Sequence, residues 1–337
     1  MTVKPHIVHV LGTLGTGGAQ RIVLEMITSP VLQAYRHSIV CAIARQGEFL
    51  ESYHANHIPV YLCPFRWPAS TVIPSYRVNR WLRNHLTFTF PWRFARLLRE
   101  LEADLVHTQL TAQMYLQARA VARHADLPWI WTLHGLYRSR GEDVSQWPRT
   151  VNLVRNTPAA AITAVSRAAL EEVLVSGQLP PQKARVIPNG IDISKFDSSI
   201  PRDPEWRVRW AIPHDALLFG TAGRLIEVKR HDIFLEAAAR LIQASECPSA
   251  HFAIAGDGHL RHQLEEHVRR LGIESSFHLL GYQSDMRRFM RELDVFVLPS
   301  DSEGFSNVLL EACAMRLPCI ATAVGGVPEV LSDNAGI

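Results

Sequence analysis

The stretch DVFVLPSDSEGFSNVLLEACAMRLPCIATAVGGVPEV, residues 294–330, carries the pattern that decides the fold. It begins with an apolar run rich in valine, passes through a polar turn that holds Glu303, and continues as an apolar helical run that includes Glu311. A second short apolar run and a second helical run follow. Regular alternation of strand and helix is typical of a parallel sheet with helices packed on its faces. The stretch therefore predicts an α/β unit, and its two carboxylates raise the question of what they bind.

The same alternation extends along the whole chain and predicts two doubly wound α/β units. Strands are expected near 6–11, 38–43, 104–107, 129–133, 161–165 and 184–187, and then near 217–222, 251–255, 276–280, 294–298 and 318–321. Helices are expected near 18–28, 91–102, 110–124 and 166–176, and then near 231–244, 258–271, 285–292, 306–316 and 326–332.

Polar residues and two prolines in IDISKFDSSIPRDPEW, residues 191–206, interrupt this alternation before LLFGTAG, residues 217–223, resumes it. Such an interruption predicts a domain boundary. We expect an N-terminal Rossmann-like domain at 1–200 and a C-terminal one at 201–337. Because ligands of doubly wound domains bind at the carboxyl ends of the strands, two such domains in tandem predict a binding cleft between them.

Composition and cysteine usage predict a globular protein of a reducing compartment. Of the 337 residues, 47% are hydrophobic and 20% charged, which is enough for two buried cores. The five cysteines are scattered and show no spacing typical of a zinc site or a disulfide framework. The N-terminal run HIVHVLG, residues 6–12, is too short for a signal peptide or a spanning helix. A cytoplasmic protein without a metal is expected.

The net charge of +3 conceals an uneven distribution. Residues 1–200 contain 21 Lys and Arg against 13 Asp and Glu, whereas the remainder contains 14 against 19. Seven arginines and three tryptophans lie between Glu51 and Glu100, where no acidic residue occurs. One interpretation is contact of residues 64–99 with an anionic membrane surface, and the other is a solvated basic face with packed tryptophans. The sequence leaves both open, and nucleic acid is not an expected partner.

The first glycine cluster, VLGTLGTGGAQR at 10–21, connects the first predicted strand to a helix. The amides of Gly15 and Gly17 can approach an anion at the N-terminus of that helix. The alternative is a turn that needs glycine only for its tight geometry. A dinucleotide site is disfavoured, because the G-x-G-x-x-G spacing is absent and Arg45 stands where an acidic residue would bind the ribose.

Two cations follow the first strand of the second half. In GRLIEVKRHD, residues 223–232, Arg224 and Lys229 come after Gly223 and precede a helix. Two cations at the carboxyl end of a strand suit a diphosphate, whose charge they neutralise, although basic residues after a strand are also common on ordinary surfaces. A glycine turn at Gly256, after the next strand, adds a loop at the same edge of the sheet.

The two carboxylates of residues 294–330 suit the hydroxyls of a sugar or ribose. Ser306 or Asn307 can cap the helix that follows Glu303, and the first amides of that helix suit an anionic group. Glu311 lies in the first turns, where its carboxylate can accept hydrogen bonds from neighbouring hydroxyls. The alternative is that Glu311 faces solvent. Because its neighbours in the helix are apolar, the exposed face of the helix would then be narrow.

Two polar residues stand at predicted strand ends in the first half. His134 follows the strand of WIWTLHG, residues 129–135, and Ser166 begins the helix after the strand of AITAVS. His134 can hydrogen-bond a bound sugar, and Ser166 lines the same edge in a doubly wound sheet. Both residue types are also common at such positions as capping or half-buried residues.

These motifs, in this order, resemble glycosyltransferase family 4, whose members are retaining enzymes of the GT-B fold that use nucleotide sugars. The resemblance spans almost the whole chain and rests on GTLGTGGAQR (12–21), LVHTQ (105–109), TLHG (132–135), AVS (164–166), VIPNGID (186–192), GRLIEVKRHD (223–232), IAGDG (254–258), EGFSNVLLE (303–311) and GGVPE (325–329). The spacing of Glu303 and Glu311 matches the family's two-glutamate signature.

The resemblance implies a hexosyltransferase that moves a sugar from a UDP-sugar or GDP-sugar to a glycoconjugate, polysaccharide or lipid-linked acceptor of the cell envelope, without a metal or other cofactor. The cytoplasmic location expected from the cysteines and the N-terminal run, with peripheral contact at the inner face of the membrane as the interpretation of the Arg and Trp content of residues 64–99, is a separate prediction. The catalytic candidates are His134, Arg224, Lys229 and Glu303, and the donor-binding candidates are Gly15, Gly17, Ser166, Asn189, Gly223, Gly256, Phe305, Ser306, Asn307 and Glu311.

The resemblance also implies a role for each group. Arg224 and Lys229 would hold the diphosphate, Glu311 the ribose and Glu303 hydroxyls of the donor sugar, with His134 near the reacting centre. In front-face attack the departing phosphate accepts the proton of the acceptor, so the two glutamates are not an acid/base pair of the hydrolase kind.

Family members normally continue past GGVPE through a further strand and a last helix, so we expect this sequence to be truncated at its C-terminus. Two alternatives to a transferase stay open. One is a nucleotide-sugar-binding remnant without catalysis, and the other is an epimerase or phosphorylase of the same fold.

Overall fold

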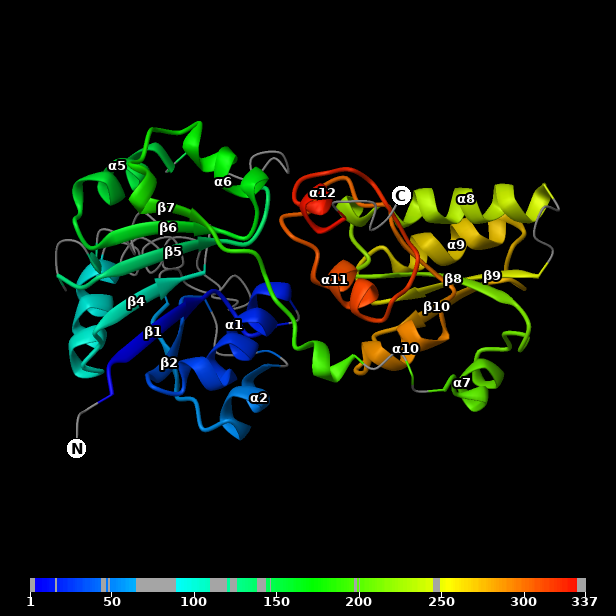
Figure 1. The fold of residues 1–337 in the computed structure, drawn as a ribbon, viewed down its shortest axis with the longest axis horizontal. Helices are drawn as coiled ribbons and strands as arrows, with labels where there is room; N and C mark the ends of the chain where they lie inside the picture. Colours follow the sequence, from blue (N-terminus) through cyan, green and yellow to red (C-terminus); the bar gives the residue numbers. More distant parts are fainter. Residues whose placement is uncertain are drawn as a thin grey trace, which may run out of the picture. The chain divides into compact units, whose positions relative to one another are not determined.

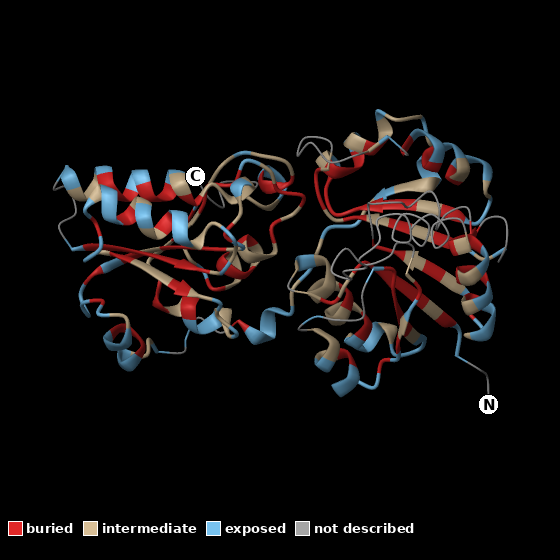
Figure 2. Ribbon diagram, turned by 180° about the vertical axis from the view of Figure 1, so that it is seen from behind, coloured by how far each residue is buried: buried red, intermediate tan, exposed pale blue. Residues whose placement is uncertain are grey.

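The computed structural model of the protein contains two compact α/β units, Met1–Pro188 and Asn189–Ile337 (Figure 1). In each unit the strands are largely buried and the outer faces of the helices are exposed (Figure 2). The residues that the structure describes are 4–15, 17–43, 47, 49–64, 89–109, 120–121, 126–137, 144–145, 147–196, 199, 201–244 and 249–331.

A seven-stranded parallel sheet forms the centre of the first unit, in the order β3-β2-β1-β4-β5-β6-β7. Its strands are β1 (His6–Leu11), β2 (Arg36–Cys41), β3 (Val60–Leu62), β4 (Leu105–Thr108), β5 (Trp129–Leu133), β6 (Ala160–Ala164) and β7 (Ala184–Val186). The predicted strands agree with six of these within two residues. The edge strand β3 is an addition, because three residues are too few to show a period of two.

Helices cover both faces of this sheet. The described helices are α1 (Gly18–Thr28), α2 (Phe49–Ala55), a helix at 89–100, α5 (Trp147–Asn156) and α6 (Arg167–Leu174), with short 3₁₀ turns at Pro30–Leu32 and Pro181–Lys183. The predictions for α1, for 91–102 and for α6 with its Ser166 N-cap are confirmed. The predicted helix at 110–124 lies mostly outside the described residues. α2 and α5 are additions, and the spacing of Trp147, Val151 and Val154 is the signal that predicts α5.

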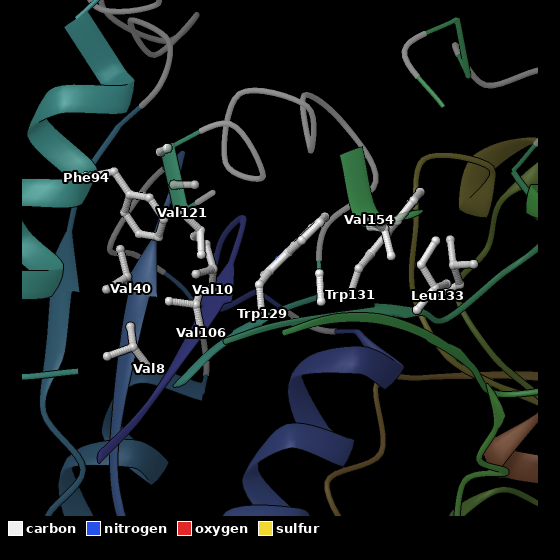
Figure 3. Close-up of a cluster of buried hydrophobic side chains, with 14 of the residues drawn as sticks. Val8, Val10, Val40, Phe94, Val106, Val121, Trp129, Trp131, Leu133 and Val154 are labelled. Carbon is white, nitrogen blue, oxygen red and sulfur yellow. The ribbon is translucent and has the colours of Figure 1, made fainter. Parts of the chain in front are cut away.

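The main core of the first unit lies on one face of this sheet (Figure 3). Val10, Val106 and Trp129 of neighbouring strands face Phe94 of the helix at 89–100, and Val154 of α5 lies against the same cluster. Each such side chain contributes about 1.5–3 kcal/mol to stability through burial. A smaller cluster packs α1 and α2 on the opposite face. The sheet is therefore held from both sides, which fixes the loops at the ends of its strands.

The second unit contains a five-stranded parallel sheet in the order β10-β9-β8-β11-β12. Its strands are β8 (Leu217–Ala222), β9 (Ala250–Ala255), β10 (Phe277–Gly281), β11 (Val295–Leu298) and β12 (Cys319–Ala321), and its helices are α7 (Pro204–Arg209), α8 (His231–Gln243), α9 (Arg261–Leu271), α10 (Met286–Glu292), α11 (Asn307–Ala314) and α12 (Val327–Val330). All five strands and the five helices from α8 onward agree with the prediction. Phe252 and Ala253, successive residues of β9, belong to different clusters, so a core lies on each face of the sheet.

The second unit begins earlier than the expected boundary at residue 200. Phe196 is 9% exposed and lies in the core beside α10 and α11, and Ile191 packs against the same core. The segment that resembles a polar linker therefore belongs to the second unit.

α7 also lies in that segment and is anchored by a buried ion pair. Arg207 Nε lies 3.2 Å from Glu292 Oε2, and the two side chains are 3% and 1% exposed. The Arg207 guanidinium also donates to the carbonyl oxygens of Pro213 and Ala216, so the buried charge is fully hydrogen-bonded. Removal of one partner would leave an uncompensated buried charge.

Candidate functional site

The strand order of the second sheet places its reversal between β8 and β11. The chain leaves β8 toward β9 and β10 on one side, and β11 is followed by β12 on the other side. In doubly wound sheets, loops diverge at such a reversal and leave room for a ligand at the carboxyl ends of the strands. The loop after β8 holds Gly223, Arg224 and Lys229, and the loop after β11 holds Glu303, so the structure brings the predicted residues of this unit to one edge.

Glycine permits the loops after β8 and β9 to pack backbone against backbone. Gly223 and Gly256 have φ values of 155° and 151°, and a Cβ atom on Gly256 would lie 1.9 Å from the carbonyl oxygen of Gly223. The amide of Leu225 donates to the carbonyl of Asp257 at 2.9 Å. Any side chain at position 256 would therefore separate the two loops.

Lys229 and Glu303 meet in a partly buried ion pair. Lys229 Nζ donates to Glu303 Oε1 at 2.7 Å, and the side chains are 19% and 9% exposed. Ser300 Oγ donates to the same carboxylate oxygen, also at 2.7 Å, and the amide of Gly326 donates to the Glu303 carbonyl at 3.1 Å. Glu303 is thus held by three segments, one of which is the glycine turn of GGVPE.

A second ion pair, which no pattern in the sequence indicates, joins the same two loops. Arg230 Nη1 lies 3.0 Å from both carboxylate oxygens of Asp301, and Arg230 also donates to Asp232 at the start of α8. These carboxylates raise the pKa of Arg230 further above its ordinary value. The amide of Asp301 donates to the carbonyl of Val228 at 2.9 Å. Together with the Lys229–Glu303 pair, these contacts join the two loops.

The N-terminus of α11 lies directly after Glu303. Ser306 occupies the N-cap, but its hydroxyl makes no capping bond. Its Oγ is fully buried and has no hydrogen-bond partner within the described part of the chain. A buried hydroxyl beside helix amides that lack intrahelical acceptors suits an incoming anionic oxygen. Asn189 Nδ2 donates to Asn307 Oδ1 at 2.8 Å, which holds the Asn189 side chain at this same turn.

Glu311 is only 2% exposed and lies on α11, whose other residues are buried or partly buried. This burial excludes the alternative of a solvent-facing glutamate. A carboxylate accepts hydrogen bonds, and ribose hydroxyls are donors of the kind that it can accept from. Arg224 is exposed at the other loop, and Phe305 is partly buried beside the N-cap.

His231, the first residue of α8, is a further buried group of this site. It is 2% exposed, and its Nε2 donates to the carbonyl of Arg224 at 3.3 Å. Burial lowers its pKa to about 4, so the ring is neutral near pH 7. It therefore positions the backbone of Arg224 without adding charge. A histidine at a helix start carries no sequence signal for this role.

In the first unit, His134 lies at the end of β5 in a chain of polar side chains. His134 Nε2 donates to Gln109 Oε1, and Gln109 Nε2 lies 3.0 Å from the ring of His107. His107 Nε2 lies 2.7 Å from Thr132 Oγ1. Burial lowers the pKa of His134 to about 4 and, with a smaller contribution from His134, that of His107 to about 3. His134 is therefore a neutral hydrogen-bonding group, oriented by Gln109.

Gly15 and Gly17 lie in the loop between β1 and α1, and neither has a φ value in the left-handed region. A Cβ atom on Gly15 would come no closer than 3.8 Å to the described residues, and one on Gly17 would meet only the flexible side chain of Gln20. Tight turn geometry therefore does not explain these glycines, which favours close approach of a ligand. Ser166, by contrast, is fully buried and caps α6 by accepting from the amide of Ala169 at 3.1 Å.

The described residues contain no group of three His, Cys, Asp or Glu side chains placed to hold a metal ion. None of the helices in that part of the chain combines the length and apolar character that a bilayer-spanning helix needs.

Two family models match the chain. The model described as Glycosyltransferase Family 4 matches residues 16–195, and the model described as Glycosyl transferases group 1 matches residues 216–337.

Among the relatives, the chain is 28% identical over 235 residues to the UDP-Gal:alpha-D-GlcNAc-diphosphoundecaprenol alpha-1,3-galactosyltransferase of Escherichia coli. The aligned region covers 68% of this chain and 60% of that protein. It is 27% identical over 249 residues to the phosphatidylinositol N-acetylglucosaminyltransferase GPI3 subunit of Saccharomyces cerevisiae, with 73% of this chain and 54% of that protein covered. The chain thus spans less than two thirds of the length of these relatives.

The crystal structure of Anabaena Alr3699/HepE in complex with UDP-glucose superposes on this chain with a TM-score of 0.77 at 20% sequence identity. The superposition covers 97% of this chain and 83% of that one. The likeness shows that the two parallel α/β units are those of the GT-B fold predicted from the sequence.

Proposed function

Since the chain belongs to glycosyltransferase family 4, we propose that it transfers a sugar from a nucleotide diphosphate sugar to a glycan or lipid-linked acceptor, with retention of configuration. The observation that carries the proposal is the edge of the second sheet, where Lys229, Glu303 and the N-terminus of α11 converge at the reversal of strand order. Both named relatives act on lipid-linked acceptors and one structural neighbour binds UDP-glucose, which supports this choice of substrates.

In the proposed complex the diphosphate lies against cations and helix amides. Arg224 and Lys229 supply positive charge, and the first amides of α11 with the hydroxyl of Ser306 supply donors. The bond to the leaving phosphate breaks as negative charge develops on it. Groups that are already oriented toward that charge stabilise the transition state more than the ground state.

The two glutamates bind neutral parts of the donor. Glu311, buried on α11, accepts from ribose hydroxyls, and Glu303, held by Ser300 and Lys229, accepts from hydroxyls of the sugar. For His134 we propose a hydrogen bond to substrate through its neutral ring. In this scheme the departing phosphate accepts the proton of the acceptor, and no metal takes part.

A thermal-shift panel tests the donor site. A ligand at 100 times its dissociation constant stabilises a protein by about 2.7 kcal/mol, or about 5–10 °C for a unit of this size. We expect that shift in Tm with UDP, GDP, a UDP-sugar or a GDP-sugar, and we expect the Glu311→Gln variant to show no shift. The matched control is Glu274→Gln, which removes an exposed glutamate between α9 and β10 and should keep the full shift.

Product analysis separates transfer from the alternatives. Release of the nucleoside diphosphate together with a new glycoside supports the proposal. An isomerised nucleotide sugar indicates an epimerase, a sugar phosphate indicates a phosphorylase, and ligand binding without turnover indicates a binding protein. A chain that no nucleotide or nucleotide sugar stabilises would contradict the assignment of the site itself.

We also propose that the first unit contacts an anionic membrane surface from the cytoplasmic side. On the helix at 89–100, Trp92 is 49% exposed, and Arg96 and Arg99 are exposed one and two turns later. An exposed tryptophan beside arginines suits the boundary between lipid headgroups and chains. Residues 65–88 of the predicted surface lie outside the described part. Salt-sensitive sedimentation with anionic vesicles, reduced in Trp92→Ala, is expected, and sedimentation with neutral vesicles alone would contradict the proposal.

A further inference from the structure

A hollow of about 410 Å³ lies at the amino edge of the first sheet, whereas His134 stands at the opposite, carboxyl edge. The strands of a parallel sheet all start at one edge, and the helices between them end there. Lys4 precedes β1, Tyr35 precedes β2, Thr28 ends α1, and His57 lies in the turn between α2 and β3. These four residues stand around the hollow, which we call the amino-edge hollow. It is within the range of volumes typical of small-molecule sites.

The floor of the amino-edge hollow is apolar and firmly held. Ile27 and Ile58 are 5% and 8% exposed and belong to the cluster that packs α1 and α2 on the sheet. His37 forms a further part of the lining, and both of its ring nitrogens are bonded within the chain. Its Nε2 lies 3.0 Å from the carbonyl oxygen of Leu32, and its Nδ1 lies 3.0 Å from Nε2 of His9. The ring of His37 is therefore a fixed wall.

Two polar side chains of the hollow use only part of their hydrogen-bonding capacity within the chain. Lys4 Nζ donates to the carbonyl of Gln33 at 2.7 Å, and Asn56 Nδ2 donates to the carbonyl of Ser52 at 2.8 Å. An ammonium has three N–H groups, and an amide oxygen accepts two hydrogen bonds. These contacts thus hold both side chains in place and leave donors on Lys4 and an acceptor on Asn56.

Tyr35 and His57 bring polar groups that the described part of the chain leaves without a hydrogen bond. Tyr35 is 39% exposed, and its ring lies 6.5 Å from the ring of His37. Neither the Tyr35 hydroxyl nor the His57 ring has a hydrogen-bond partner among the described residues. The hollow therefore combines an aromatic ring, an apolar floor, and groups that donate and groups that accept.

The backbone at His57 does not account for a histidine there. His57 has a φ of 58°, and its amide donates to the carbonyl of His54 at 2.9 Å. The amide of Ile58 donates to the carbonyl of Tyr53 at 3.0 Å, so these two bonds close the end of α2. Glycine is the residue that best fits such a left-handed position after a helix. A side chain at this position is explained by a contact of the ring with a ligand.

The charge of the hollow indicates the class of ligand. Lys4 is the one Lys or Arg in the described lining, and that lining includes no Asp or Glu. The C-termini of α1 and α2 oppose the charge of Lys4, because a helix end of this kind carries up to about half a negative charge. A phosphate or carboxylate needs several cations or helix N-terminal amides. The hydroxyls of a sugar both donate and accept, and its ring carbons pack on apolar and aromatic side chains.

We propose that the amino-edge hollow is a second ligand site, which binds an uncharged mono- or disaccharide. The ring of the sugar packs on Tyr35 and the apolar floor, and its hydroxyls bond Lys4, Asn56 and His57. The site goes beyond the proposed transfer reaction, since it shares no residue with the donor site of the second unit and lies at the other edge of the first sheet from His134.

The test uses the whole purified chain, with maltose, lactose and N,N′-diacetylchitobiose as probes and saturation-transfer NMR as the readout. We expect at least one of these disaccharides to bind with a millimolar dissociation constant. Tyr35→Ala and His57→Gly should each weaken that binding about fivefold or more, which corresponds to the loss of one net hydrogen bond or ring contact.

Two control variants separate a lost contact from a damaged fold. His54→Ala removes an exposed histidine of α2 that does not line the hollow, and it should keep the binding. Ala211 in the second unit has a φ of 53°, so Ala211→Gly and His57→Gly should both raise Tm, and only His57→Gly should weaken saccharide binding.

Three results would overturn the proposal. The first is that none of the three disaccharides binds. The second is binding that Tyr35→Ala and His57→Gly leave unchanged, which would place the sugar elsewhere on the chain. The third is displacement of the disaccharide by inorganic phosphate or a hexose phosphate at lower concentrations than by a neutral hexose, which would make this an anion site.

Discussion

Glu303→Gln removes the charge that Lys229 faces and keeps the shape of the side chain. The carboxylate accepts from Lys229 Nζ and Ser300 Oγ, both at 2.7 Å, and its side chain is 9% exposed. Exposed ion pairs contribute about 0–1 kcal/mol, and breaking a fully buried pair costs about 3–5 kcal/mol. With Lys229 19% exposed, this pair lies between those limits, and we expect a loss of about 2 kcal/mol. For a unit of this size that loss lowers Tm by about 4–8 °C.

The assay is scanning calorimetry of the wild type, Glu303→Gln, Lys229→Met and the double variant. Each single variant leaves its partner without a counter-charge, whereas the double variant does not. The double variant should therefore lose less than the sum of the two single losses, by at least about 1 kcal/mol. The control is Glu265→Gln, which breaks the Arg261–Glu265 pair at 2.9 Å, where the side chains are 36% and 42% exposed. It should lower Tm by about 2 °C or less. Equal losses in Glu303→Gln and Glu265→Gln would refute the reasoning from burial.

Three further outcomes are expected. Ser306→Ala removes a buried hydroxyl that has no partner among the residues that the structure describes, so it should leave Tm unchanged or raised while weakening nucleotide binding about fivefold or more by calorimetric titration. Gly256→Ala should unfold the second unit or lower its stability by more than 3 kcal/mol, whereas Gly272→Ala, whose Cβ meets open space, should cost about 1 kcal/mol in the same denaturation assay. The free energy of unfolding should fall as the pH drops from 6.5 toward 4. His134 and His231 have pKa values of about 4 in the folded state, so between these pH values they bind protons only in the unfolded chain. The slope should reach about 1.4 kcal/mol per pH unit for each ring and should be smaller in His231→Asn.

The order of strands and helices was predictable because apolar periodicity is a local property. All strands of the second unit and its helices from α8 onward follow from it. β3 escapes prediction because it is three residues long, and α7 because its segment is polar and rich in proline. The early boundary at Asn189 also escapes, since the packing of Phe196 on a distant core has no signal in the neighbouring residues.

At the site, the sequence pointed to residues that stand at strand ends, and it missed the residues that hold them. Glu303 and Lys229 are visible as polar groups at the ends of apolar runs, but their contact joins positions far apart in the chain. Arg230 and Gln109 act through such long-range contacts and are not distinguished from ordinary surface residues by any pattern. Contacts of this kind become predictable only when the sheet order is known.

The Lys229–Glu303 contact also bears on ligand selectivity. An anion that approaches Lys229 meets a cation that already has a counter-ion, so a small anion such as inorganic phosphate must compete with a carboxylate held in place by Ser300. In the proposed complex, the sugar nucleotide donates hydroxyls to Glu303 in exchange and thereby releases Lys229 for its phosphates. If the proposed function holds, the pair favours ligands that present hydroxyls and phosphates together. It also makes binding less sensitive to salt than the number of nearby cations suggests, because one of those cations is compensated before the ligand arrives.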